Sequence, residues 1–286
     1  MAIANQILQG ILLGGLYTLF ALGLSLSVGV MRFVNIAHGD LIVLVSFVLL
    51  VIATALGIHP FLAALIVMPL CFAGGWLLQR LLLQRVVGQG ILPIILVTFG
   101  LSVIIQNGLL QTFGADTRKL SGGAIETATI NLGGGFNIGV LPLVTFLVAV
   151  LMVVALDAIL YRTRIGARIR AVADDVSAAD LIGLPSPRIY AVAMGIIGVT
   201  IAVAAVAMAV RTNFDPASGP SRLLVAFEVV VLGGLGSLWG TLIGGILLGV
   251  AQSIGAQFDA AWQVIAGHIV FLILLLLRPQ GLLPKY

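Results

Sequence analysis

Long apolar stretches that contain almost no charged residues dominate this sequence and restrict what it can fold into. The run "LPLVTFLVAVLMVVALDAILY", from Leu141 to Tyr161, holds one charged residue in 21. Over the whole chain 61% of residues are hydrophobic and 8% are charged, far below the roughly 25% charged residues of soluble domains. One core cannot bury this much apolar surface, so we expect an integral membrane protein. The run does not alternate as a barrel strand does, so the spans are predicted to be helices.

Eight or nine stretches are long enough to cross a bilayer, since a spanning helix needs about 20 apolar residues. The predicted spans lie near 5–29, 39–57, 60–79, 91–113, 138–160, 188–210, 225–238, 240–257 and 263–278. The seventh and eighth are short and rich in glycine, so they form either a tight hairpin or one irregular span. We therefore expect an all-α polytopic bundle of 8–9 transmembrane helices, with residues 1–286 in a single domain.

Basic residues gather on one side of the predicted membrane, and such residues accumulate in cytoplasmic connections. The predicted inner side carries Arg32, Arg80, Arg85, Arg162, Arg164, Arg168, Arg170, Arg188, Arg278 and Lys285. The predicted outer side carries Arg118, Lys119, Arg211 and Arg222. With nine spans this bias places the N-terminus outside and the C-terminus inside. With eight, the uncharged N-terminus is the one free to change sides.

The predicted inner connection over 161–188 is the one strongly charged segment. The helical spacing of its small and polar residues predicts a short amphipathic helix, which Pro185 and Pro187 end. An ordinary solvated connector is one interpretation. Docking in a groove of another protein is the other, because a solvated helix does not need alanines on one face. The candidates for this docking are Gly166, Arg168, Arg170, Ala171, Asp174, Ala178, Ala179 and Gly183.

Motifs for catalysis are absent from the sequence. A phosphate-binding loop needs a lysine followed by Ser or Thr, and neither Lys119 nor Lys285 is so followed. There is no HExxH motif and one cysteine, so we expect no ATP hydrolysis by this chain, no cofactor, no metal and no nucleic-acid partner. A transport pathway powered by a partner ATPase is the first interpretation. An ion-gradient carrier is the weaker alternative, because His268 is the one ionisable residue predicted near the middle of a span.

The stretch "MRFVNIAHGDLIVL", Met31 to Leu44, concentrates polar residues between two apolar runs. We expect it at the inner end of the first span. Asn and Asp begin helices well and Gly allows a sharp turn, so a broken-helix junction on a solute path is one interpretation. A polar turn that merely starts the second span is the other. The candidates for the path are Asn35, His38, Gly39, Asp40 and Glu228, the last predicted near an outer end of its span.

A glycine-rich run, "VVVLGGLGSLWGTLIGGILLGV", occupies the region of the two short spans. Small residues let membrane helices approach closely, so these glycines serve either as gate hinges or as packing contacts, and packing is the favoured interpretation. They are Gly233, Gly234, Gly236, Gly240, Gly244 and Gly245.

Four segments follow a known pattern in order: "ALGLSLSVGVMRFVNIAHGDLIVLVSF", "TRIGARIRAVADDVSAADLIGL", "AFEVVVLGGLGSLWGTLIGGILLG" and "RPQGLLPK". They resemble the permeases of branched-chain amino acid ABC transporters of the LivH type, and they cover the chain from end to end. The chain departs from that pattern with Asp40 where Glu is usual, Ile36 where Phe is usual, and Glu228 where a small or neutral residue is common.

The resemblance implies a bacterial inner-membrane importer whose coupling loop and C-terminus are cytoplasmic. It implies a second, related permease subunit in a heterodimer, two cytoplasmic ABC ATPases and a periplasmic substrate-binding protein. The implied substrate is Leu, Ile, Val or a related small solute. Urea and short amides are the alternative within the family.

A shift of 180 positions relates the first four predicted spans to the last four of the nine-span arrangement. The shift aligns Ala37, Gly39, Val45 and Phe47 with Ala217, Gly219, Val225 and Phe227. Inverted repeats are a common plan among transporters. We therefore expect an ABC importer permease fold with an inverted repeat.

Overall fold

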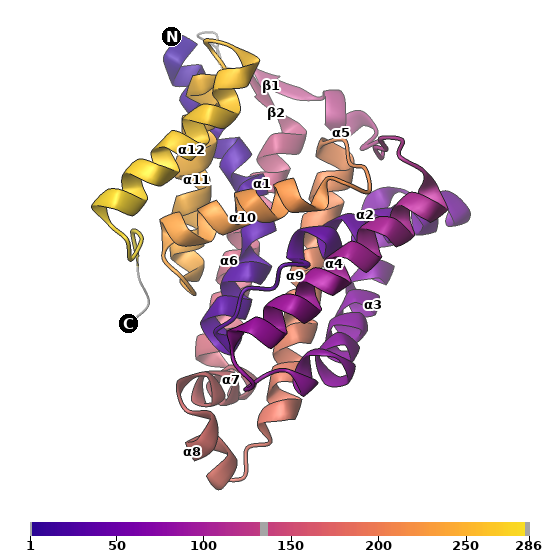
Figure 1. Ribbon diagram of the computed structural model, residues 1–286. Coiled ribbons are helices and arrows are strands. Elements are labelled where there is room, and N and C mark those ends of the chain that lie inside the picture. Colours follow the sequence, from indigo (N-terminus) through magenta and orange to yellow (C-terminus); the bar gives the residue numbers. More distant parts are fainter. Residues whose placement is uncertain (1, 132–136, 284–286) are drawn as a thin grey trace.

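The chain folds into a bundle of helices with one small hairpin at its edge (Figure 1). The computed structural model describes residues 2–131 and 137–283; Lys285, counted above on the predicted inner side, lies outside the described residues. The long helices are α1 (Ala2–Met31), α2 (His38–Leu56), α3 (Pro60–Leu81), α4 (Ile91–Phe113), α6 (Val140–Arg162), α9 (Ser186–Arg211), α10 (Gly219–Gly233), α11 (Leu238–Gly255) and α12 (Ala260–Leu277). The shorter elements are η1 (Leu83–Arg85), α5 (Ala124–Thr127), β1 (Thr129–Asn131), β2 (Asn137–Gly139), α7 (Arg164–Asp174) and α8 (Val176–Leu181).

Eight of the described helices are long and apolar enough to cross a membrane, namely α1, α2, α3, α4, α6, α9, α11 and α12. The helix α10 is shorter, with 15 residues. The sequence predicted a span over 225–238, whereas this helix begins at Gly219 and ends at Gly233. The described residues therefore contain eight candidate spans, and α10 is not one of them, which matches the lower of the two predicted counts.

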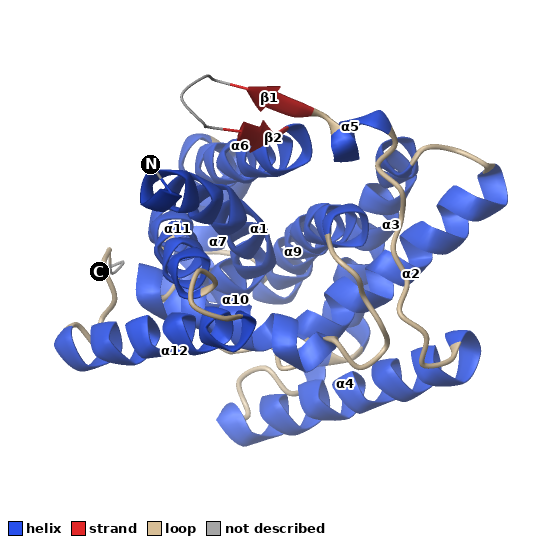
Figure 2. Cartoon of the chain, turned by 90° about the horizontal axis from the view of Figure 1, so that it is seen from above, coloured by secondary structure: helices blue, strands red, loops and turns tan. Residues whose placement is uncertain are grey.

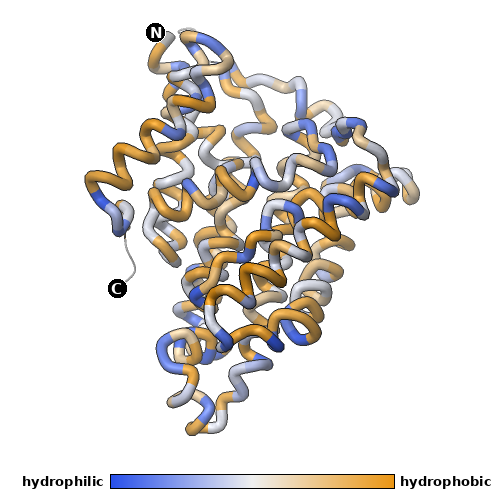
Figure 3. The backbone as a smooth tube through the Cα atoms, viewed as in Figure 1, coloured by the Kyte–Doolittle hydropathy of each residue, from blue (hydrophilic) through white to orange (hydrophobic). Residues whose placement is uncertain are grey.

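Two helices form the centre of the bundle, and the others surround them. The most hydrophobic windows of α1 and α9 are 83% and 78% buried, against 6% for α12. Seen from above, α4 and α12 lie along one edge, and the β1–β2 hairpin lies with α6 at the opposite edge (Figure 2). Hydrophobic residues run along both α4 and α12 (Figure 3). The peripheral helices therefore present the apolar surface that a bilayer requires.

Glycines of the predicted glycine run lie in close helix contacts. A β-carbon on Gly245 would fall 2.3 Å from Oγ1 of Thr18 in α1. A β-carbon on Gly240 would fall 2.2 Å from the carbonyl oxygen of Gly233, across the α10–α11 turn. Both distances leave no room for a larger side chain, so they favour the packing interpretation of these glycines.

The turn between α10 and α11 depends on glycine for a different reason. Gly234 and Gly236 adopt φ angles of 105° and 77°, a region that residues with a side chain rarely occupy. A β-carbon on Gly236 would also fall 2.7 Å from the Cα of Gly29, at the end of α1. The reversal of the chain here therefore requires both backbone freedom and the absence of a side chain.

The helix pairings repeat in the two halves of the chain. The helix α1 packs along α11, and α9 packs along α3. A shift of 180 positions places α1 on α9 and α3 on α11, so the two pairings are equivalent. The end of α1 lies beside α7, where Arg32 donates to the carbonyl oxygen of Asp174 at 3.5 Å. The end of α9 lies at the other side, where Phe214 bridges to Arg118. The two helices thus run in opposite directions, as the predicted inverted repeat requires.

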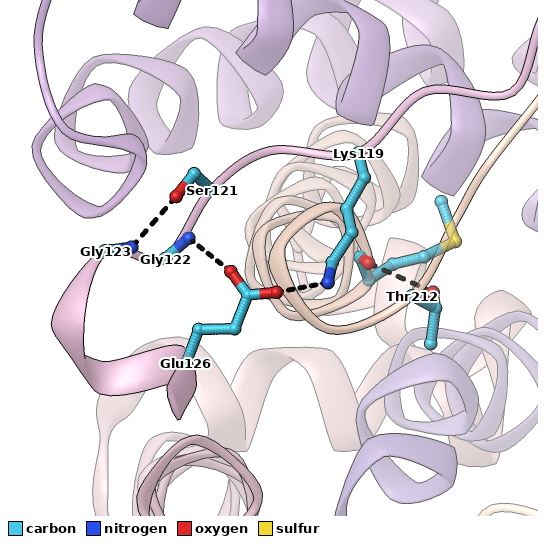
Figure 4. Close-up of polar contacts among 7 residues, drawn as sticks. Lys119, Ser121, Gly122, Gly123, Glu126 and Thr212 are labelled. Carbon is cyan, nitrogen blue, oxygen red and sulfur yellow. Dashed lines mark hydrogen bonds and ion pairs between the residues drawn. The ribbon is translucent and has the colours of Figure 1, made fainter. Parts of the chain in front are cut away.

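Short polar contacts within the connection between α4 and α6 hold it in shape (Figure 4), and the Leu120 N–H donates to the carbonyl oxygen of Ala209 near the end of α9 at 2.8 Å. The carboxylate of Glu126 accepts hydrogen bonds from the Lys119 ammonium and from the Gly122 N–H, the latter at 3.1 Å. The hydrogen bond from Lys119 is the main reason that the pKa of Glu126 lies below its usual value. The two charged groups therefore fix the shape of this connection.

Candidate functional site

The helix α2 begins deep inside the fold. The Nε2 atom of His38 lies 2.8 Å from the carbonyl oxygen of Phe20, which is in the middle part of α1, about 16 Å before that helix ends at the usual rise of about 1.5 Å per residue. Met31 and Arg32 lie at the end of the first span, but the expectation that His38 and the residues after it also lie there is wrong. The chain leaves α1 and returns into the bundle before the next helix starts.

Local hydrogen bonds explain why the chain returns. Arg32 ends the first helix with a φ angle of 56°, the one positive φ of a non-glycine residue among those described. Asn35 then forms a turn, because its Oδ1 accepts from the Ala37 N–H at 3.1 Å and its carbonyl oxygen accepts from the His38 N–H at 3.1 Å. Asn35 thus satisfies two buried backbone N–H groups of this turn.

Asp40 connects three helices. Its Oδ2 accepts from the Ser102 hydroxyl at 2.6 Å and its Oδ1 accepts from the Gln106 amide at 3.0 Å, both in α4. The side chain is buried, and a β-carbon on Gly219 would fall 1.9 Å from its Oδ1. The carboxylate therefore lies in the first turn of α2 and against the first residue of α10. Negative charge is favourable at both helix starts.

The first turns of α2 and α10 are in direct contact. A β-carbon on Gly39 would fall 2.0 Å from the carbonyl oxygen of Gly219. Two helices that start inside the bundle and run in different directions form a discontinuous arrangement (Figure 1), of the kind that lines solute paths in transporters. Four of the predicted path residues, Asn35, His38, Gly39 and Asp40, gather at this junction and are all buried.

Glu228 lies elsewhere, in contact with a residue that was not among the path candidates. Its Oε1 meets Nδ1 of His268 in a short contact, and its Oε2 is buried without a partner in the described structure. His268 is near the middle of α12, so Glu228 is not near an outer end as the sequence suggested. The reason is that α10 starts within the bundle rather than at its edge. This pair fastens α10 to α12, as Asp40 fastens α2 to α4.

Two arginines near Tyr17 were not among the site candidates, because the sequence assigned them to an outer connection. Arg211 donates to the carbonyl oxygen of Leu12 at 3.0 Å. Arg222 lies in the first turns of α10, with its guanidinium 5.8 Å from the ring centre of Phe20. Both lie within electrostatic range of Tyr17, whose hydroxyl donates to Gln252 at 2.5 Å. The 180-residue shift was the available signal for Arg222, since it places that residue just past the counterpart of Asp40.

The predicted coupling helix is two helices. Asp175 separates α7 from α8 with extended backbone, and its Oδ1 accepts from the Ala178 N–H at 3.0 Å as the N-cap of α8. An aspartate competes for nearby backbone N–H groups, which is why it interrupts a helix here. The prediction of one short amphipathic helix in the connection over 161–188 is therefore wrong in this detail.

The docking candidates occupy different environments on these two helices. Gly166 is packed, since a β-carbon there would fall 2.1 Å from the carbonyl oxygen of Ile159. Ala179 is buried, whereas Ala178 and Gly183 are exposed, the latter with a φ of 82°. The guanidinium of Arg170 lies over the Tyr161 ring at 4.8 Å. The remaining candidates, Arg168, Ala171 and Asp174, lie on α7 with partial or full exposure.

An apolar tip on this segment was not foreseen. Leu181 and Ile182 are 88% and 75% exposed at the end of α8. Beside them a groove of about 490 Å³ is lined by Arg168, Arg188 and Leu184, among others. Exposed large apolar side chains next to basic ones indicate a protein contact.

Side chains that commonly bind metal ions do not cluster in the described part of the fold. Within residues 2–131 and 137–283, no three His, Cys, Asp or Glu side chains lie together so that they could hold a metal ion. The polar groups at the junction are suited to hydrogen bonding and charge pairing.

Comparisons with known proteins agree with this picture. The family model that matches residues 6–277 is that of the permease component of branched-chain amino acid transport systems. The high-affinity branched-chain amino acid transport system permease protein BraD of Pseudomonas aeruginosa is 27% identical over 295 residues, which cover 98% of this chain and 95% of BraD. The corresponding LivH protein of Salmonella typhimurium is 29% identical over 301 residues, with the same two coverages.

A more distant match concerns a second permease protein of such systems. LivM of Escherichia coli is 31% identical over 146 residues, which cover 50% of this chain and 34% of LivM. No solved structure matches the chain. The whole-length matches are thus to membrane permeases.

Proposed function

We propose, because the chain belongs to the family of permease components of branched-chain amino acid transport systems, that it forms half of the membrane pathway of an ATP-driven importer for Leu, Ile and Val. The observation that carries this proposal is the junction at which α2 and α10 begin inside the bundle, with Asp40 between them. Such a junction places helix ends and polar groups at membrane depth, where a zwitterionic solute needs them.

The energy for transport comes from partner ATPases in this proposal. The chain has two lysines and no phosphate-binding loop. The exposed Leu181 and Ile182, the groove beside them and the basic residues around it offer a docking surface for a cytoplasmic ATPase. The loop of α7 and α8 and the C-terminus accordingly lie on the cytoplasmic side of a bacterial inner membrane.

Two further partners complete the importer. A second permease subunit is supported by the similarity of half of this chain to LivM, because related subunits that share a fold can pair around a common path. A substrate-binding protein on the outer side then delivers the amino acid. The outer surface available to it includes the connection that Lys119 and Glu126 hold in shape.

Uptake by reconstituted transporter tests this function. The chain is co-purified with the second permease subunit and the ATPases and reconstituted in liposomes. ATP is supplied on the side of the ATPases, and the binding protein loaded with amino acid is added on the opposite side. We expect uptake of labelled leucine, isoleucine and valine that requires ATP and survives a proton and sodium ionophore. Uptake that ionophores abolish would support a gradient-driven carrier instead, and uptake of urea or glutamine but not leucine would change the substrate.

A further inference from the structure

Arg222 lies at the depth of the helix junction. It is the fourth residue of α10, and its guanidinium carbon is 5.8 Å from the ring centre of Phe20. The carbonyl oxygen of that same Phe20 contacts His38. One aromatic residue in the middle part of α1 is therefore in contact with both the start of α2 and this arginine.

The hydrogen-bonding capacity of Arg222 is largely unused. Its Nη2 donates to the carbonyl oxygen of Asn213 at 3.2 Å, and its Nε is buried without a partner among the described residues. None of the ion pairs in the described part of the chain includes it. A guanidinium offers five N–H donors, so most of them remain available.

The charged groups around Arg222 do not neutralise it. Asp215 is within electrostatic range, but its Oδ1 accepts from the Ala217 N–H at 2.9 Å in a local turn. The other charged groups near Tyr17 are Arg211, which adds a second positive charge, and Glu228, whose Oε1 contacts His268. An unpaired cation at membrane depth is costly and marks a path for solutes or ions, and an anionic group would offset that cost.

We propose that Arg222 binds the carboxylate of the amino acid as it crosses the junction. The planar guanidinium matches a carboxylate with two parallel hydrogen bonds, and every branched-chain amino acid carries this group. The start of α10 adds partial positive charge at the same place. Asp40 does not take this role, because a carboxyl group does not attract another carboxylate and its oxygens already accept from Ser102 and Gln106. The inference rests on the proposed function.

Arg222 is also partly exposed, so a solute can reach it. The exposed neighbours Pro220 and Ser221 lie on the same turns of α10. Arg222 thus combines a buried Nε with a partly exposed side chain.

The test uses the complete transporter with Arg222→Gln and Arg222→Lys, and Arg80→Gln as the matched control. Arg80 is an exposed arginine at the end of α3, and its guanidinium lies 4.9 Å from the ring centre of Trp76. Uptake of labelled leucine is measured at matched membrane abundance. We expect Arg222→Gln to lower uptake about tenfold or more, since it removes charge-assisted bonds, and Arg222→Lys to lower it less. The control should match the unmodified protein.

Binding measured without turnover separates a contact with the solute from a structural role. Saturation-transfer NMR is recorded on the purified transporter with leucine and with leucinamide, which lacks the carboxylate. The unmodified protein should give a leucine signal well above the leucinamide signal, and Arg222→Gln should reduce leucine to the leucinamide level.

The outcomes distinguish this inference from the proposed function. Unmodified protein that transports no branched-chain amino acid would overturn both. Active unmodified protein with an Arg222→Gln variant that keeps full uptake and the carboxylate preference would overturn the inference alone. If Arg222→Gln does not reach the membrane, Arg222→Lys decides: full uptake with normal preference contradicts the inference, and reduced uptake at normal abundance supports it.

Discussion

Gly39 and Gly219 lie 180 positions apart in the sequence and meet where two helices begin inside the membrane-spanning bundle. A β-carbon on Gly39 would fall 2.0 Å from the carbonyl oxygen of Gly219, and one on Gly219 would fall 1.9 Å from Oδ1 of Asp40. The contact joins equivalent positions of the two halves of the chain. The first turns of α2 and α10 can therefore approach only because both positions lack a side chain.

The variant Gly219→Ala is expected to destabilise the protein, because its methyl group would overlap the Asp40 carboxylate. Overpacking of this kind costs roughly 1–3 kcal/mol. The matched control is Gly108→Ala in α4, since nothing lies within 4 Å of a β-carbon there. The melting temperature of purified protein should fall for the first variant and stay equal or rise for the second. Equal melting temperatures would mean that the junction is looser than described.

Asp40→Asn should reduce uptake strongly, whereas Asp40→Glu should retain more of it. The carboxylate accepts from both Ser102 and Gln106 and faces two helix starts, so the amide loses both an acceptor and a favourable charge. Charge at a helix start contributes about 0.3–1 kcal/mol, or up to about 2 kcal/mol when partly buried. Leucine uptake at matched membrane abundance is the measurement.

A control for that pair comes from Asp259, the N-cap of α12, whose Oδ1 accepts from the Ala261 N–H at 3.3 Å. Asn caps a helix about as well as Asp, so Asp259→Asn should transport normally. If Asp40→Asn and Asp40→Glu transported equally well, the charge at the junction would have no role and the stretch would be a polar turn.

The two-helix segment of α7 and α8 should lose its partner when its apolar tip is removed. The double variant Leu181→Ser and Ile182→Ser should no longer co-purify the ATPases, because these side chains are 88% and 75% exposed. Ala178→Trp, on an exposed position, should uncouple ATP hydrolysis from uptake. The control Ile130→Ser changes an apolar residue that is 42% exposed on the opposite side, and should co-purify normally. Retention of the ATPases by the double variant would exclude this surface.

The contact of Lys119 with Glu126 makes a small, pH-dependent contribution to stability. Because the folded pKa of Glu126 is lowered below 4.5, the contribution is present at pH values above 4.5 and is lost as the pH falls through the lower, folded pKa. The difference in melting temperature between unmodified protein and Glu126→Gln should therefore be largest near neutral pH and vanish in acid. A difference that grows on acidification would contradict the assignment.

The sequence was sufficient for features that depend on local composition. Runs such as Leu141–Tyr161 identify their helices because apolar length alone decides whether a segment spans a bilayer. The predicted start of α10 was several residues too late, because the apolar run covers 225–238. The local signal for the true start is weak, since it consists of Ser218 followed by Pro220. The break at Asp175 was missed because the spacing of alanines continues through it.

The partners within the site could not be read from the sequence. Asp40 pairs with Ser102 and Gln106, some 60 positions away, and Glu228 pairs with His268. Neither pairing leaves a periodic or compositional signal, because both depend on how α4 and α12 cross the central helices. The depth of His38 was hidden for the same reason: re-entry of the chain after Arg32 is a tertiary feature.

The central claim, that the solute passes the start of α10, is tested most directly by water access at Ser221. In a Cys71→Ala background, Ser221→Cys is compared with Ile104→Cys, an α4 residue that is 70% exposed on an apolar helix. A charged methanethiosulfonate reagent modifies thiols only where water can ionise them. In the complete transporter we predict that Ser221→Cys is modified, at a rate that ATP changes, and that Ile104→Cys is not. Protection of Ser221→Cys with and without ATP, equal to that of Ile104→Cys, would contradict the claim.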